Sequence, residues 1–179
     1  ENIIICNIRL KNFKWVEKKI IDFQNAKKTS NELMLSYSYL LLGKKNFNKG
    51  FSYFDARLET NEFKKRNKYH YNIIKNYNKQ KEFENNKSIL VVREQGVGDE
   101  ILLSSIYNDL IKKNISKIKI ECDNRLLEIF KRSFNKNIFY PFGHYSSSNK
   151  TLQEFDNILY AGSLTRYFRK KENDFDNEP

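Results

Sequence analysis

The chain has 179 residues, of which 39% are hydrophobic and 31% charged, and its formal net charge is +11. This composition allows a buried core and excludes a chain that is disordered throughout. The positive charge invites an interpretation as a nucleic-acid-binding protein, but Lys and Asn are spread along the whole chain. That spread favours a solvated surface with a composition bias and no specific nucleic-acid partner. The chain starts at Glu1 rather than at a Met, so we expect a piece of a longer protein.

Few residues have the chemistry or the spacing of a metal site. Cys6 and Cys122 are far apart, and His70 and His144 are isolated, so we expect no bound metal and no cofactor. Two such distant cysteines also favour a reduced, cytoplasmic protein. No apolar run reaches the roughly 18–20 residues of a membrane helix, so we expect no transmembrane segment.

Residues 1–60 have the apolar spacing of helices. We predict two antiparallel helices at 31–43 and 46–59, joined by a short turn, and a further helix at 9–26. Ser30 or Asn31 is the expected N-cap of the helix at 31–43, and Gly43 is its expected C-terminal stop. The apolar stripes comprise Phe13, Val16, Ile20, Phe23, Leu33, Tyr37, Leu40, Leu41, Phe47, Phe51, Phe54 and Leu58.

The helical pair also carries a small residue where two helices must approach each other closely. This residue is Gly50, and Phe54 follows one turn later. In this spacing the pair resembles a tetratricopeptide repeat (TPR), and residues 9–26 would be the last helix of a preceding repeat. The match is partial, because the usual Trp and Pro landmarks are missing and no second copy recurs at a period of about 34 residues. The resemblance implies a protein partner for this TPR-like hairpin.

Residues 61–87 are rich in Asn, Lys and Tyr and are predicted to be a connector. One helix is expected around Tyr69, Ile73, Ile74 and Tyr77. Tyrosines interleaved with Lys are able to stack on bases, but we favour packing against the neighbouring domains.

From residue 88 to 179 the hydrophobic period becomes that of an α/β domain. Predicted strands at 89–92, 118–122, 138–140 and 155–160 alternate with predicted helices at 100–113, 125–134 and 163–168. This alternation predicts a Rossmann-like parallel sheet with right-handed crossovers, of which the chain holds only a part. A polar loop at 146–148 precedes the last strand. The predicted inner face of the first helix comprises Ile101, Leu102, Ser105, Ile106 and Leu110.

A turn with the sequence Glu-Gln-Gly-Val-Gly-Asp joins the first strand to this helix. It is not a dinucleotide-binding fingerprint, because Ile101 occupies the position of the third glycine. It is not a P-loop either, since no Gly-Lys-Ser/Thr follows. Its two glycines allow positive φ and a close approach of the backbone to a ligand. We therefore expect Gln95, Gly96, Val97 and Gly98 to bind substrate.

Asp99 lies at the N-cap or in the first turn of the predicted helix, where the helix dipole favours a carboxylate. A carboxylate there that faces a cleft is able to accept the proton of a substrate hydroxyl as a general base. The alternative is a capping aspartate that only satisfies backbone N–H groups, and the residues alone leave both open. Glu94 and Glu100 flank Asp99, so we expect a locally acidic pocket that suits a neutral hydroxylated acceptor better than a phosphate.

Taken together, residues 31–170 resemble the glycosyltransferase-like domain that follows tetratricopeptide repeats in bacterial proteins. That domain is akin to the lipopolysaccharide heptosyltransferases of the GT-B fold. Further matches are Gly-Phe-Ser-Tyr-Phe-Asp-Ala-Arg at 50–57, Glu-Cys at 121–122, Leu-Leu-Glu-Ile-Phe at 126–130, Asp156, and Ser-Leu at 163–164. Departures from the family pattern are Asp55, one residue added before Arg57, and Thr165 in place of a proline.

The resemblance implies that Asp99 is the catalytic base of an inverting transfer from a nucleotide-sugar donor to a hydroxyl of a glycan or protein acceptor. It also implies that this incomplete GT-B N-terminal domain holds the acceptor, while a C-terminal domain outside the chain holds the donor. The alternative is a non-catalytic interaction scaffold, in which the helical pair binds a partner and the α/β domain has kept its fold without its chemistry.

Overall fold

The computed structural model describes residues 2–25, 29–68, 71, 87–113, 115–134, 136–144 and 152–175. The chain divides into two compact units. The helical unit comprises Glu1–Lys64 and Arg169–Pro179, and the sheet unit comprises Lys65–Phe168. The helix expected around Tyr69 to Tyr77 and the loop at 146–148 lie outside the described residues.

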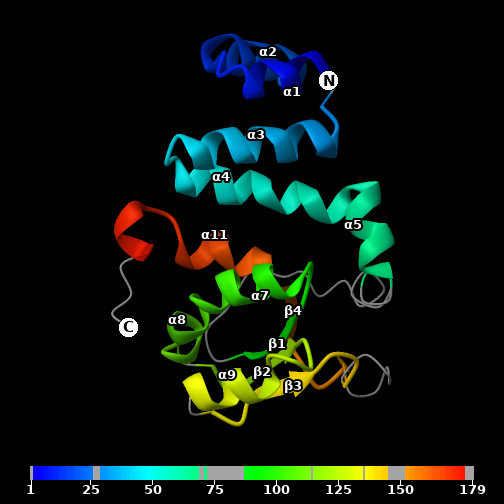
Figure 1. The fold of residues 1–179 in the computed structure, drawn as a ribbon, viewed down its shortest axis with the longest axis vertical. Coiled ribbons are helices and arrows are strands. Elements are labelled where there is room, and N and C mark those ends of the chain that lie inside the picture. The colour runs from blue at the N-terminus through cyan, green and yellow to red at the C-terminus, as the bar shows by residue number, and fades with distance from the viewer. Residues whose placement is uncertain are drawn as a thin grey trace. The chain divides into compact units, whose positions relative to one another are not determined.

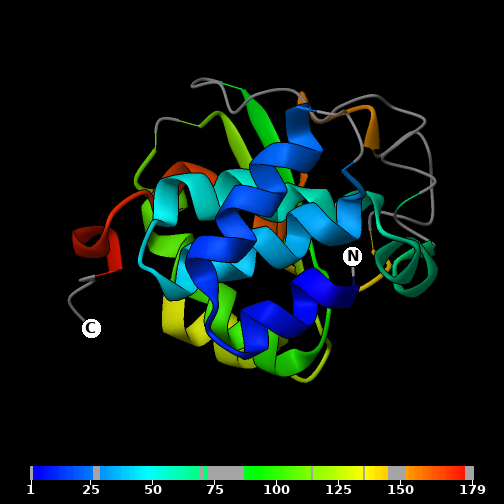
Figure 2. The ribbon, with the colours of Figure 1, turned by 90° about the horizontal axis from the view of Figure 1, so that it is seen from above.

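The helical unit is built from consecutive short helices. These are α1 (Asn2–Arg9), α2 (Phe13–Asn25), α3 (Asn31–Gly43) and α4 (Phe47–Phe54), then a 3-10 turn η1 (Asp55–Glu59) and α5 (Asn61–Arg66). α3 and α4 lie side by side as a hairpin (Figure 1), and Figure 2 gives the same helices from above, with α1 and α2 nearest the viewer. The buried residues Ile4, Val16, Ile20, Leu33 and Leu40 form the core of this part.

The helix predicted at 31–43 is confirmed, and its start is explained by its cap. The Oγ of Ser30 accepts a hydrogen bond of 3.1 Å from the backbone N–H of Leu33. At the other end Gly43 is the last helical residue, but the left-handed residue that reverses the chain is Lys45, with φ of 59°. The helix predicted at 46–59 is α-helical only as far as Phe54, and its remainder is the 3-10 turn η1. α1 was not predicted.

The end of the described chain belongs to the helical unit. The 3-10 turn η3 (Glu172–Phe175) places the ring of Phe175 at 4.7 Å from that of Phe47, and Glu172 forms an ion pair with Lys45. The sequence predicts that these residues belong to an α/β domain at 88–179. They group with the helical unit instead, where an aromatic side chain and an acidic one contact α4 and the turn before it.

The sheet unit contains a four-stranded parallel sheet with the order β3-β2-β1-β4. Its strands are β1 (Ser88–Val92), β2 (Lys117–Cys122), β3 (Phe139–Pro141) and β4 (Asn157–Tyr160). Ile89 of β1 is in register with Ile118 of β2 and with Asn157 of β4. The predicted α/β class and parallel sheet are therefore confirmed. Every residue of β1 is buried, as expected for a central strand of a parallel sheet, and every residue of β4, at the edge of the sheet, is buried as well.

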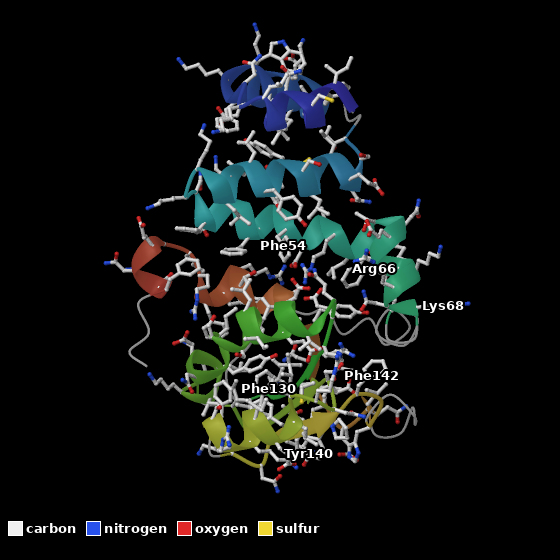
Figure 3. All side chains as sticks on the ribbon, in the orientation of Figure 1. Phe54, Arg66, Lys68, Phe130, Tyr140 and Phe142 are labelled. Atoms are coloured by element: carbon white, nitrogen blue, oxygen red, sulfur yellow. The ribbon has the colours of Figure 1, made fainter. Side chains whose placement is uncertain are left out.

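Helices follow the strands: α7 (Val97–Ser104) and α8 (Tyr107–Ile111) lie between β1 and β2, α9 (Leu127–Phe134) lies between β2 and β3, and the 3-10 turn η2 (Ala161–Leu164) and α11 (Thr165–Phe168) follow β4. Tyr107, Phe130, Phe134 and Phe139 pack together, with ring centroids 5.3–6.1 Å apart, and Figure 3 labels Phe130 among them. In the part of the chain that the structure describes, no helix is long and apolar enough to span a membrane.

The helix predicted at 100–113 differs from expectation in its bounds and in its buried face. The segment is divided into α7 and α8 by a turn at 105–106, and α7 begins at Val97. Ile106 and Leu110 are buried as predicted, but the exposed fractions of Ile101 and Leu102 are 54% and 72%, and Ser105 is also exposed. The prediction of the inner face was wrong at these three positions. The buried residue of α7 is Glu100, a charged residue that periodicity assigns to solvent.

Candidate functional site

The candidate site lies where the strand order reverses. β2 and β3 lie on one side of β1, and β4 lies on the other. In open parallel sheets, ligands bind at the carboxyl ends of the two strands that flank such a point, here β1 and β4. The turn that carries Asp99 follows β1, and η2 follows β4. The predicted turn is therefore at the position where this architecture binds ligands.

Asp99 is exposed and lies in the first turn of α7. Gly96 is the N-cap residue, and its backbone N–H donates a hydrogen bond of 3.1 Å to Oδ2 of Asp99. The capping role is therefore present, and it uses one carboxylate oxygen. The structure places Asp99 and the expected substrate-binding residues Gln95, Gly96, Val97 and Gly98 in one short turn.

Gly96 and Gly98 do not adopt the positive φ that their lack of a side chain allows. The left-handed residue is Gln95, with φ of 64°, whereas Gly96 is extended, with φ of −97°. A Cβ added at Gly98 would meet no atom within 4 Å, and one at Gly96 would meet only Oδ2 of Asp99, at an ordinary 3.6 Å. Nothing packed against these two positions in the described chain requires a glycine. At Gly96 and Gly98 the turn therefore exposes its backbone, with no side chain covering it.

The side chains of the turn differ in what they are able to contact. Gln95, Gly96, Gly98 and Asp99 are exposed, whereas Val97 is half-buried and packs against the core of the sheet unit. The side chain of Val97 is therefore used largely for packing, unlike those of its exposed neighbours.

Glu94 connects the two strands that flank the site. It is only 1% exposed, and its carboxylate accepts a hydrogen bond from the backbone N–H of Gly162 in η2. This bond joins the turn after β1 to the turn after β4. Glu94 therefore connects the two turns structurally and is not exposed to a ligand.

Glu100 is likewise buried, with an exposed fraction of 1%. Its Oε1 accepts a hydrogen bond of 2.6 Å from Nε of Arg93, and its Oε2 accepts one of 2.8 Å from the backbone N–H of Asp123. Burial raises the pKa of the Glu100 carboxyl, and the Asp123 amide and the Arg93 charge oppose that rise. Glu94 and Glu100, from which we expected an acidic pocket, are therefore both buried and hydrogen-bonded, and neither carboxylate is exposed beside Asp99.

Arg93 is the centre of a network that joins three strand ends. Besides Glu100 it faces Asp123, with 3.6 Å between Nη2 and Oδ2, and its guanidinium lies 5.0 Å from the ring centroid of Phe142. Hydrogen bonds from Arg125 lower the pKa of the Asp123 carboxyl. Figure 3 labels Phe142 in the turn that follows β3.

The sequence reasoning missed Arg93, Asp123 and Phe142. One signal was available, because each of them directly follows a strand, and the carboxyl ends of parallel strands meet at one edge of a sheet. Asp156, by contrast, precedes β4. Its Oδ2 accepts hydrogen bonds of 2.8 Å from the N–H and the hydroxyl of Ser88, so it joins the amino ends of β1 and β4, away from the candidate site.

Among the described residues, no group of three or more His, Cys, Asp or Glu side chains is placed to hold a metal ion. Comparison of the chain with protein-family models, with curated proteins and with solved structures found no match.

Proposed function

We propose that the chain is the acceptor-side part of a glycosyltransferase-like protein, and that Asp99 is its general base. The observation that carries the proposal is the turn itself. An exposed aspartate lies beside two glycines that no neighbouring side chain requires, at the reversal of strand order where parallel sheets bind ligands. The motif of this turn resembles that of the heptosyltransferase-like domains, which supports the same assignment.

The proposed chemistry uses the Asp99 carboxylate on an acceptor hydroxyl. The carboxylate accepts the hydroxyl proton while the acceptor oxygen forms a bond to the anomeric carbon of the donor sugar, and the bond from that carbon to the phosphate of the leaving nucleotide breaks. The Gly96 N–H orients the carboxylate through Oδ2. Because Glu94 and Glu100 are buried and hydrogen-bonded, Asp99 is the exposed carboxylate of the turn.

The proposal extends to the arrangement of the whole protein. The sheet unit would be the acceptor half of a GT-B enzyme acting in the cytoplasm without a metal or other cofactor, with the donor held by a second domain. The helical unit would be a TPR-like region that binds a protein partner. The close approach of α3 and α4 at Gly50 supports this, because its absent Cβ leaves room for Leu42.

The second candidate function is that of a non-catalytic scaffold, and the hydrogen bond of Asp99 favours it. The hydrogen bond from Gly96 already gives Asp99 a structural role, since it satisfies an N–H at the start of α7. A protein that has lost its chemistry would keep such a cap.

Two substitutions of Asp99 separate the base from the cap. Asp99→Asn keeps an oxygen that accepts the Gly96 N–H but is no longer a base, whereas Asp99→Ala removes both functions. We expect both variants of the natural full-length protein to lose about 10²- to 10⁴-fold in transfer rate. Only Asp99→Ala should also lose the hydrogen bond to the Gly96 N–H, which contributes about 0.5–1.5 kcal/mol to stability.

The assay measures nucleoside diphosphate released from a panel of nucleotide sugars in the presence of hydroxyl acceptors. Glu128→Gln is the matched control, because Glu128 is an exposed acid in the first turn of α9 and pairs with Lys131. Transfer by Asp99→Asn at the wild-type rate would contradict the base assignment. Absence of donor binding and transfer in the wild type would favour the scaffold.

A further inference from the structure

We propose that Arg93 is a positioning residue that sets the rotation of α7 about its axis and thereby turns Asp99 toward the exterior of the site. The expected effect of Arg93 on catalysis depends on the function proposed above, whereas its effect on the conformation of α7 does not. The inference starts from the unexpected face that α7 buries.

α7 buries a charged residue and exposes apolar ones. Glu100 is 1% exposed, whereas Ile101 and Leu102, which follow it directly, are 54% and 72% exposed. Neighbouring helix residues are separated by about 100° around the axis. A rotation of that size would exchange Glu100 for Ile101 at the sheet, but it would also carry Leu103 away from the core against which it packs. Burying the Glu100 carboxylate on the same face as Leu103 requires an interaction of its own.

The bonds of Glu100 supply that interaction. One carboxylate oxygen is held by the Arg93 side chain at the end of β1, and the other by the Asp123 backbone at the end of β2. Attachment at two points on two strands fixes the direction in which Glu100 points. Asp99 precedes Glu100 by one residue, so fixing Glu100 also fixes Asp99 on the exposed side, where it accepts the Gly96 N–H.

Arginine suits this role better than lysine. Its planar guanidinium contacts Glu100, reaches Asp123 and lies over the Phe142 ring, and a lysine ammonium has no comparable planar fork. Without a cation at position 93, the Glu100 carboxylate would be buried with one hydrogen bond and no charge partner. It would then leave the interior, and α7 would rotate.

The direct test is the backbone amide of Gly96, observed by NMR as its chemical shift and its hydrogen-exchange protection. We expect Arg93→Met to shift this signal and to lower its protection about fivefold, the effect of losing a helix cap. The matched control is Arg125→Met, which removes an exposed arginine that also contacts Asp123 but forms no hydrogen bond to Glu100 in the described structure. It should leave the Gly96 amide unchanged.

A double variant distinguishes positioning from a merely electrostatic effect. Arg93→Met with Glu100→Met replaces the ion pair by two apolar side chains of similar length, which buried sites often accept. Because an apolar residue at position 100 again favours the observed face, we expect Gly96 protection to return to within about twofold of the wild type. Arg93→Lys keeps a cation beside Glu100, so it should fold even if Arg93→Met does not, and it should show a smaller shift in the same direction.

Two results would overturn the inference. One is a Gly96 amide whose chemical shift and protection equal those of the wild type in every folded Arg93 variant. The other is a double variant that folds but does not recover the amide signal. In the natural protein, Arg93→Lys should lower kcat with little change in donor KM, and it should have no further effect in an Asp99→Asn background. If Asp99→Asn retains full transfer, the proposed function fails, while the amide experiment still decides the inference about α7.

Discussion

A single methyl group added at Gly50 tests the packing of the α3–α4 hairpin. Gly50 is buried in α4, and a Cβ built there would lie 2.6 Å from Cδ2, 2.8 Å from Cγ and 3.2 Å from the backbone N of Leu42. Side chains do not approach one another this closely. A change of the Leu42 side-chain rotamer would move Cδ2 and Cγ at a cost in packing, but the backbone N cannot move without displacing α3. Gly50→Ala should therefore separate the two helices.

Gly43→Ala provides a matched control for the size of this effect. Gly43 also lies in the hairpin, at the end of α3, and a Cβ there would meet no atom within 4 Å. Both substitutions gain helix propensity, so most of that gain cancels when the two variants are compared. Overpacking remains, and it costs about 1–3 kcal/mol. Gly50→Ala should be less stable than Gly43→Ala by that amount.

Urea unfolding followed by circular dichroism measures the difference, and thermal unfolding checks it. For a chain of this length, each kcal/mol corresponds to roughly 2–4 °C in Tm. A second variant, Leu42→Ala in the Gly50→Ala background, removes the atoms that clash and should recover part of the loss that Gly50→Ala causes. Equal stability of Gly50→Ala and Gly43→Ala would refute the reasoning, because the close approach would then place no constraint on position 50.

Two further predictions concern the sheet unit and its titratable groups. Cys122 is fully buried, and its burial raises the pKa of the thiol to about 12, whereas Cys6 is exposed. A disulfide reagent at mildly alkaline pH should therefore label Cys6 in the native protein and Cys122 only in denaturant. Prompt labelling of both native thiols would contradict this. The lowered pKa of Asp123 means that its carboxylate stabilises the fold at pH values above the ordinary range for Asp, and that this contribution is lost as the pH falls through the folded-state pKa. Between about pH 5 and pH 2, the unfolding free energy of Asp123→Asn should therefore decrease less than that of the wild type, as measured by urea titration. Parallel decreases in the two proteins would contradict this prediction.

The candidate site could be located from the sequence, but its interior could not. The Gly-x-Gly turn between an apolar run and a helix identifies the end of the first strand, because turn chemistry and periodicity are local properties. The directions of Glu94 and Glu100 depend on partners 68 and 23 residues away, at Gly162 and Asp123. No local pattern indicates that these two carboxylates are buried while the one between them is exposed.

What the sequence determined by itself is the class of the fold and the position of the strands and of some of the helices. Strands such as Ser88–Val92 and helices such as Asn31–Gly43 follow from hydrophobic period and capping residues, and both act over a few neighbouring residues. Tertiary structure alone decided the strand order, the face that α7 buries and the return of Phe175 to Phe47. These depend on contacts between residues far apart in the chain, such as the hydrogen bond from the Asp123 backbone to Glu100, which is buried while Ile101 and Leu102 are exposed.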